Sequence, residues 1–146
     1  MIKYIDTMRI LGLDFGSKRI GAAISDELCI TAQPLKSITI TDPNDAIEEI
    51  SNIINKFQIK EIVIGLPLNM NGSAGEAAKR VIKFAETIQE RFSLPVFLWD
   101  ERLTTTQAEK LLINAGLKRI KRRSKIDRLA ASLILQGFLD SRRNRD

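Results

Sequence analysis

Five short segments of the chain consist of apolar residues or of alternating apolar and polar residues, which is the pattern of β-strands. We expect these strands over residues 9–15, 19–26, 35–40, 59–66 and 94–99. Elsewhere apolar residues recur every three or four positions, which predicts helices. The helices are expected to begin after Asp42, after Ser73, near Thr105 and near Ser124, and the third is expected to end at Gly116.

The predicted helices carry local start signals and apolar faces. Asp42 precedes Pro43, a residue favoured at the first helical position. Ser73 with Glu76, and Ser124 with Asp127, have the spacing of a capping box. The inner faces of the second and last helices are predicted to hold, respectively, Ala77, Val81, Phe84, Ala85, Ile88 and Phe92, and Ile126, Leu129, Ala130, Leu133, Ile134 and Phe138.

The order of these elements predicts the fold class. Three strands joined by short turns favour an antiparallel meander, and the later strands alternate with helices, which favours parallel pairing. The result is an α/β architecture with a mixed five-stranded sheet flanked by helices, typical of the ribonuclease H-like fold. We expect residues 1–146 to form one domain of this kind.

Composition excludes several kinds of active site. The chain has no histidine and one cysteine, Cys29, which excludes Ser-His-Asp and Cys-His triads and thiolate zinc clusters within the chain. Catalysis would have to use carboxylates, lysine, hydroxyl groups or a hard metal ion with oxygen ligands. The sequence has no apolar run long enough to span a membrane and no signal-peptide pattern, so we expect a cytoplasmic location.

Three acidic residues are candidates for such a metal site. Asp14 stands in an apolar strand beside Gly12 and Gly16, which would leave space for an ion; it could equally accept hydrogen bonds within the hairpin turn. Glu101, next to Asp100, follows the last strand, although either acid could cap a helix or pair with Arg102. Asp127 could join them or close the last helix's capping box. Together, carboxylates from separate elements are suited to Mg²⁺ or Mn²⁺ and to phosphodiester hydrolysis.

Basic residues lie next to these acids. The net charge is +5, and six cations fall within residues 118–125, directly before Asp127. Such a run is often a solvated loop, but beside a metal site it would bind phosphates. The candidate nucleic-acid contacts are Lys18, Arg19, Arg102, Lys121, Arg122 and Arg123.

Four segments resemble the successive motifs of the YqgF/RuvX family: GLDFGSKRIGAAISD (12–26), IVIGLPLNMNGSAGEAAKRV (62–81), WDERLTTTQAE (99–109) and KIDRLAASLILQ (125–136). The resemblance implies a ribonuclease H-like nuclease that processes the 5′ end of pre-16S rRNA, or a Holliday-junction resolvase. It implies Asp14, Glu101 and Asp127 as the catalytic, metal-binding acids. It favours Glu101 over Asp100, a choice that the residues alone leave open.

Three functions therefore stand as hypotheses. The first is a metal-dependent nuclease that acts on structured RNA, the pre-16S rRNA precursor. The second is a resolvase acting on branched DNA, which would work as a C2 homodimer because it makes two symmetric cuts. The third is a non-catalytic RNA-binding factor in ribosome assembly. An ATPase of the actin/Hsp70 type, whose phosphate-binding hairpin resembles residues 13–25, would need a second copy of the domain.

Overall fold

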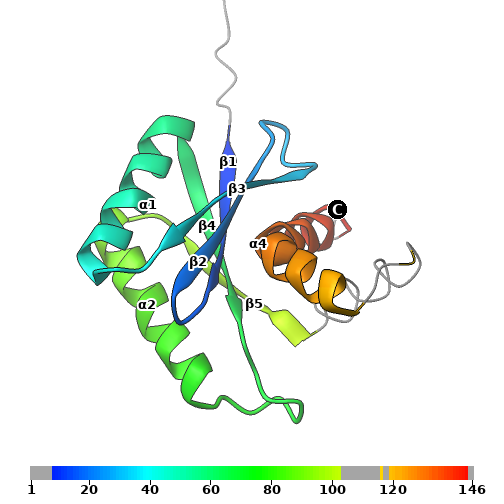
Figure 1. The fold of residues 1–146 in the computed structure, drawn as a ribbon. Coiled ribbons are helices and arrows are strands. Elements are labelled where there is room, and N and C mark those ends of the chain that lie inside the picture. The colour runs from blue at the N-terminus through cyan, green and yellow to red at the C-terminus, as the bar shows by residue number, and fades with distance from the viewer. Residues whose placement is uncertain (1–7, 103–115, 117–118, 145–146) are drawn as a thin grey trace, which may run out of the picture.

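A computed structural model describes residues 8–102, 116 and 119–144, with the backbone alone over 119–128. Five strands form one sheet in the order β3-β2-β1-β4-β5 (Figure 1). The strands β1, β2 and β3 pair antiparallel, whereas β1, β4 and β5 are parallel. The strands are β1 Arg9–Phe15, β2 Arg19–Ser25, β3 Ala32–Thr39, β4 Ile59–Leu66 and β5 Val96–Asp100; the helices are α1 Pro43–Phe57, α2 Glu76–Phe92 and α4 Arg119–Arg143.

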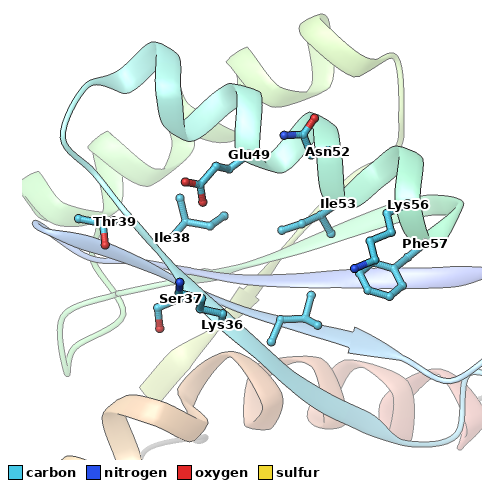
Figure 2. A pocket seen from close by; sticks show the side chains of 10 residues that line it. Lys36, Ser37, Ile38, Thr39, Glu49, Asn52, Ile53, Lys56 and Phe57 are labelled. Carbon is cyan, nitrogen blue, oxygen red and sulfur yellow. The ribbon is translucent and has the colours of Figure 1, made fainter.

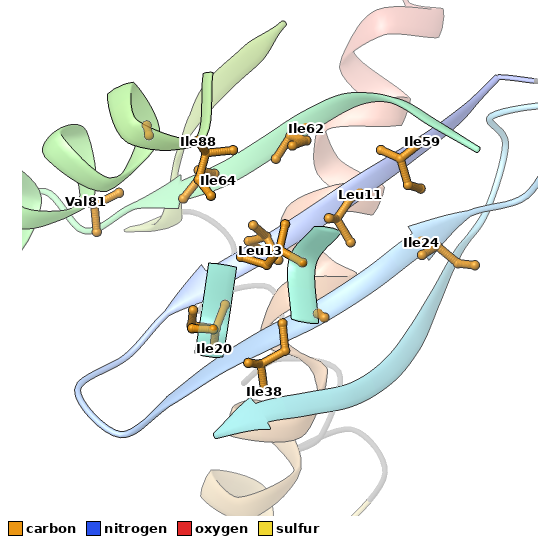
Figure 3. Packing of buried hydrophobic residues seen from close by; sticks show 14 residues of the cluster. Leu11, Leu13, Ile20, Ile24, Ile38, Ile59, Ile62, Ile64, Val81 and Ile88 are labelled. Carbon is orange, nitrogen blue, oxygen red and sulfur yellow. The ribbon is translucent and has the colours of Figure 1, made fainter. Parts of the chain in front are cut away.

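The helices cover both faces of the sheet, so two apolar layers form. On one face α1 and α2 pack over residues such as Leu11, Leu13, Ile62 and Ile64 (Figures 1 and 3). On the other face α4 packs over Ile10, Ala23 and Val63. Successive residues of a strand point to opposite faces, which explains why neighbours such as Ile10 and Leu11 belong to different layers. No described helix is long and apolar enough to cross a membrane.

The mixed sheet and its element order agree with the sequence prediction, and β1 and β4 have the predicted bounds. The strand β3 begins at Ala32 rather than Leu35. Asp26 accepts hydrogen bonds from the amides of Ile30 (2.7 Å) and Thr31 (2.9 Å), and this tight turn allows pairing from Ser25 and Ala32 onward. Pro34 lies inside β3, where it is tolerated because β3 is an edge strand.

Two of the predicted helix starts are wrong. Gly75 rather than Ser73 is the N-cap of α2, because the Ser73 side chain bonds to Asn69 and Asn71 instead. The helix α4 begins at Arg119, not near Ser124, so the Ser124–Asp127 capping box does not exist. Lysine and arginine are good helix formers, and the basic segment therefore continues the helix rather than forming a loop. The Asp42 cap is confirmed: its side chain accepts the Asn44 amide at 2.9 Å.

The inner faces of two helices also differ from the prediction. In α2, Ala78 is buried and Ala77 is exposed. In α4, Ala131, Leu135 and Leu139 are buried together with Ile134, whereas Leu129 is exposed. The apolar run 129–135 fits more than one helix face, and the sheet selects the face that places a small residue, Ala131, against it. The helix predicted over 105–116 lies outside the described residues, although Gly116 has the positive φ (75°) expected at its end.

Candidate active site

Asp14 lies near the C-terminal end of β1, on the sheet face that α4 covers. The register places it opposite Gly21 of β2, and its side chain is half-buried. Alternation along β1 puts it on the same face as Ile10 and Gly12, which both contact α4. The carboxylate therefore sits between the sheet and the helix rather than in the α1/α2 layer.

Glu101 reaches Asp14 by crossing over a glycine. It follows β5 directly, and Gly65 of β4 pairs with Trp99 of β5, so the Glu101 side chain passes over Gly65. A Cβ at position 65 would lie 2.7 Å from Glu101 Cγ and 2.8 Å from its Oε1. The carboxyl group of Glu101 hydrogen-bonds that of Asp14. Only a residue without a side chain leaves room for this contact.

The contact between the two carboxyl groups has an electrostatic consequence. Burial of Glu101, its hydrogen bond to Asp14 and the negative charges of Asp14 and Asp100 raise the pKa of Glu101 to about 9. At neutral pH Glu101 therefore keeps its proton, because two adjacent carboxylates repel each other when both are ionised. A divalent cation relieves the same repulsion, and carboxylate oxygens are ligands that Mg²⁺ and Mn²⁺ prefer. The donor set thus fits a hard metal ion.

Asp100 points away from this pair and is neutralised by another residue. Arg102 Nη2 lies 2.6 Å from Asp100 Oδ2, and Arg102 Nε donates to both carboxylate oxygens at 3.0 Å. These bonds hold the pKa of Asp100 below its usual value. The pairing with Arg102 considered in the sequence thus applies to Asp100, whereas Glu101 is the acid that meets Asp14.

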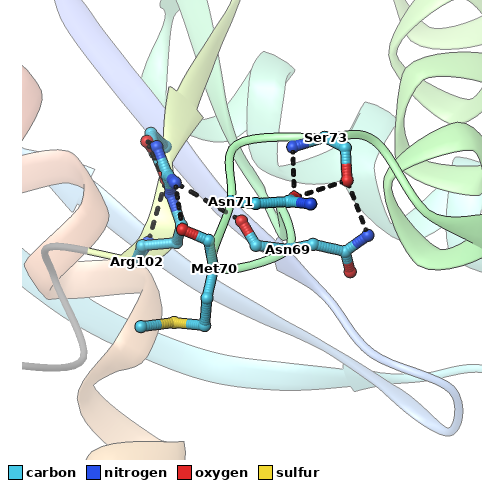
Figure 4. A network of polar contacts seen from close by, with 6 residues as sticks. Asn69, Met70, Asn71, Ser73 and Arg102 are labelled. Atoms are coloured by element: carbon cyan, nitrogen blue, oxygen red, sulfur yellow. Dashed lines mark hydrogen bonds and ion pairs between the residues drawn. The ribbon is translucent and has the colours of Figure 1, made fainter.

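Arg102 also fastens the loop between β4 and α2 to the end of β5. Its Nη1 donates to the carbonyl oxygens of Asn69 (3.3 Å) and Met70 (3.2 Å), as Figure 4 shows. The loop closes on itself through further hydrogen bonds between Asn69, Asn71 and Ser73. A residue predicted to bind nucleic acid is therefore engaged within the protein, next to Glu101.

Asp127 lies within α4, and its side chain is outside the described part of the molecule. Four residues further on, Ala131 approaches the site: a Cβ at Gly21 would lie 3.5 Å from the Cβ atoms of both Ala131 and Asp14. Asp127 is thus one helical turn before a residue that stands beside Asp14. Within the described residues no group of three or more Asp, Glu, Cys or His side chains gathers at one point, so the described site consists of Asp14 and Glu101.

The comparisons with known proteins place this chain in a family. The model of the family described as "RuvX: Holliday junction resolvase" matches residues 8–141. The chain belongs to the RuvX family. A relative from Pelotomaculum thermopropionicum, named "Putative pre-16S rRNA nuclease", is 53% identical over 92% of this chain and 88% of its own length. A relative of the same name from Thermoanaerobacter pseudethanolicus is 48% identical over 94% of this chain and all of its own.

Solved structures confirm the fold of this RuvX-family chain. Thermus thermophilus RuvC in complex with a Holliday junction substrate superposes with a TM-score of 0.53, covering 92% of this chain and 95% of that one, at 17% identity. The fowlpox virus Holliday junction resolvase gives 0.52 at 13% identity, covering 92% and 99%. These likenesses confirm the ribonuclease H-like architecture predicted from the order of elements.

The structure describes the basic residues predicted to bind nucleic acid in this RuvX-family chain to different extents. Lys18 and Arg19 are exposed in the β1–β2 hairpin, which the Gly16 amide closes by donating to the Arg19 carbonyl oxygen at 2.9 Å. Arg19 alternates with Gly21 along β2 and therefore belongs to the face of Asp14. Lys121, Arg122 and Arg123 lie in the first turns of α4, and their side chains are outside the described part.

The role expected of the glycines beside Asp14 needs correction. The space above Gly12 is filled, since a Cβ there would lie 2.8 Å from Leu135 Cβ. At Gly16 a Cβ would lie 2.8 Å from the Arg19 carbonyl oxygen. These glycines admit a helix and a tight turn, not an ion. The glycine whose role the sequence did not reveal is Gly65; its one signal was a glycine inside the apolar strand 59–66.

A separate pocket of about 390 Å³ lies between β3 and α1, on the other side of the molecule (Figure 2). Ile38, Ile53 and Phe57 form its apolar part, and Lys36 and Lys56 stand at its rim. It contains none of the candidate site residues. The pocket is therefore separate from the Asp14–Glu101 pair.

Proposed function

We propose that this chain is a divalent-metal-dependent nuclease that hydrolyses phosphodiester bonds in structured RNA, with the pre-16S rRNA precursor as its substrate. The observation that carries the proposal is the direct contact of the Asp14 and Glu101 carboxyl groups at the C-terminal ends of β1 and β5. Two acids in contact are a liability to stability unless a cation uses them. The names of the relatives support the RNA substrate and the rRNA-processing role, which would take place in the cytoplasm.

In this proposal Asp14, Glu101 and Asp127 hold the metal, Mg²⁺ or Mn²⁺. When bound, the metal supplies Lewis-acid chemistry that activates water and stabilises the leaving oxygen. Glu101 gives up its proton when the cation binds, so the site loads more readily as the pH rises. Because the chain has no histidine, proton transfer at the scissile bond falls to these carboxylates and to water.

The exposed cations of the β1–β2 hairpin and those at the start of α4 would bind the phosphate backbone on either side of the carboxylates. Lys18 and Arg19 are in no ion pair among the described residues, which leaves them available to a polyanion. Lys121, Arg122 and Arg123 would extend the surface along α4. Arg102 supports the site from within by its bonds to Asp100 and to the β4–α2 loop.

A second candidate is cleavage of branched DNA, favoured by the family description and by the likeness of the fold to RuvC. A resolvase has to cut two strands symmetrically, so this activity requires a homodimer with two-fold symmetry. The two candidates therefore separate by substrate and by the oligomeric state of the cleaving species.

The test compares the wild type with Asp14→Asn, Glu101→Gln and a matched control, Asp45→Asn, an exposed acid on α1. Labelled pre-16S rRNA precursor and a four-way DNA junction are incubated with Mg²⁺, Mn²⁺ or EDTA. We expect metal-dependent cleavage of the RNA by the wild type and Asp45→Asn only. Preferential junction cleavage by a dimer would favour the second candidate. Binding without cleavage by every protein would instead leave a non-catalytic RNA-binding factor.

A further inference from the structure

Met70 is the most exposed large apolar residue of the described chain, with 90% of its surface accessible. Figure 4 shows its side chain pointing away from the polar network of its own loop. Single exposed apolar residues are common on protein surfaces and by themselves indicate nothing. Met70 differs in two respects, the rigidity of the loop that carries it and the position of that loop.

The loop holds Met70 outward by hydrogen bonds on both sides. The Gly72 amide donates to the Asn69 carbonyl oxygen at 2.8 Å, and the Asn69 amide donates to the Ser73 carbonyl oxygen at 2.9 Å. The Asn71 side chain accepts bonds from the amide (3.0 Å) and hydroxyl (2.6 Å) of Ser73. Arg102 binds the Met70 carbonyl oxygen itself. These bonds fix the backbone on both sides of Met70, so the loop presents its side chain at the surface.

The loop flanks the carboxylate pair. It follows β4, the strand between β1 with Asp14 and β5 with Glu101, and Leu66 at the end of β4 pairs with Asp100. Arg102 joins the loop to the residue directly after Glu101. By contrast Leu28, 76% exposed, lies in the β2–β3 connection at the opposite end of the sheet, because β2 runs antiparallel to β1. Met70 and Leu28 are the two most exposed large apolar residues of the described chain, one beside the site and one remote from it.

We infer that Met70 contacts the substrate as an apolar wedge, which packs against the face of an unpaired or unstacked nucleobase next to the scissile phosphate. The inference rests on the proposed nuclease function for the position of that phosphate. A polarisable thioether on a flexible stem fits any base face, and apolar side chains inserted beside a base hold it out of its stack. The contact selects for locally open nucleic acid rather than for sequence, because every base has such a face.

The experiment measures base unstacking directly and does not depend on cleavage. The RNA precursor carries 2-aminopurine at successive positions around the cleavage site, and its fluorescence rises when the base is unstacked. Binding is measured in EDTA with wild type, Met70→Ala, Met70→Leu and the matched control Leu28→Ala. We expect one position to brighten with wild type, Met70→Leu and Leu28→Ala but not with Met70→Ala, which should bind roughly fivefold or more weakly.

A second measurement separates the wedge from the phosphate contacts. The dependence of affinity on salt reports phosphate contacts, so its slope should be the same for Met70→Ala and wild type. Equal fluorescence and affinity for Met70→Ala and Leu28→Ala would overturn the inference and leave the nuclease proposal standing. Brightening that depends on Met70 in a protein that never cleaves would overturn the nuclease proposal instead. Failure of wild type to bind the RNA would overturn both.

Discussion

The path of Glu101 over Gly65 predicts that this glycine is the most sensitive backbone position of the site. The perturbation is Gly65→Ala, a single added methyl group. It would lie 2.5 Å from Ile134 Cδ1 and 2.7 Å from Glu101 Cγ, whereas ordinary contacts of this kind begin near 3.4 Å. Both neighbours have to move.

The two neighbours differ in how far they can move. Ile134 is 1% exposed and is packed between α4 and the sheet, so it has little space to retreat. Glu101 is half-buried and can swing outward, away from Asp14. Overpacking a core costs about 1–3 kcal/mol. Removing a glycine from a strand returns about 0.5–1 kcal/mol. We therefore expect a net loss of about 1–2 kcal/mol in the free energy of unfolding, with a much larger loss of cleavage.

Gly21→Ala is the matched control, since Gly21 stands on the other side of Asp14. Its added methyl group would meet Ala131 and Asp14 at 3.5 Å, an ordinary contact distance. Urea unfolding should give Gly21→Ala the same or slightly higher stability than wild type, with cleavage retained. The reasoning is refuted if Gly65→Ala unfolds and cleaves like Gly21→Ala, because Glu101 would then not need the space above position 65.

Three further predictions concern charge. Without metal, Glu101 keeps its proton in the folded protein up to about pH 9 but loses it near pH 4.5 when unfolded, so the folded state binds more protons between these values. The free energy of unfolding, measured by urea titration in EDTA, should therefore fall as the pH rises from 5 to 9. Glu101→Gln should not show this fall. If the free energy of unfolding fell equally with pH in Glu101→Gln and wild type, the pairing of Glu101 with Asp14 would be contradicted. Arg102→Lys keeps the positive charge but removes the forked hydrogen bonds to Asp100 and to the β4–α2 loop. Amide hydrogen exchange of residues 69–73 should therefore accelerate, while the salt dependence of RNA binding stays unchanged. A changed salt dependence would instead make Arg102 a direct phosphate ligand. The third prediction compares two triple alanine variants, one of the α4 cations Lys121, Arg122 and Arg123 and one of three cations remote from the site, Lys36, Lys56 and Lys60. The α4 variant should lower the magnitude of the slope of log affinity against log salt by about 0.7–0.9 for each RNA phosphate that it no longer neutralises. The remote variant should leave that slope unchanged.

Much of the fold could be predicted from the sequence because its signals are local. The strands β1 and β4 are continuous apolar runs bounded by turns, and Asp42 with Pro43 is a complete helix start. The errors arose where tertiary context overrides a local signal. The third strand was expected to begin at Leu35, yet β3 begins at Ala32 and includes Pro34, which an edge strand accepts. Ser73 had the spacing of a cap, but the neighbouring asparagines take its hydrogen bonds.

The candidate site was predictable only in part, for a similar reason. Alternation and the edge formed by parallel strands brought Asp14 and the acids after β5 together in the prediction. The choice between Asp100 and Glu101 depends on Arg102, whose own position depends on carbonyl groups 32 and 33 residues away. A contact of that range leaves no periodic signal in the sequence. The same holds for Gly65, whose role is visible only once Glu101 is seen to lie over it.

The arrangement of glycines explains how an aspartate is accommodated in this sheet. On the α4 face, Asp14 pairs with Gly21 of the neighbouring strand β2. On its other side is β4, where Gly65 comes directly after Ile64, the partner of Leu13. Gly12 precedes it along β1. Larger residues at Gly12 and Gly65 would keep α4 and the end of β5 at a distance greater than a short aspartate side chain can bridge. With glycines there, Leu135 and Ala131 of α4 approach the strands, and Glu101 extends across β4 to Asp14. The close approaches at Gly12 and Gly65 therefore determine where the carboxylates meet, and an added side chain at either position should impair function, whereas the ordinary contact distances at Gly21 leave room for a methyl group.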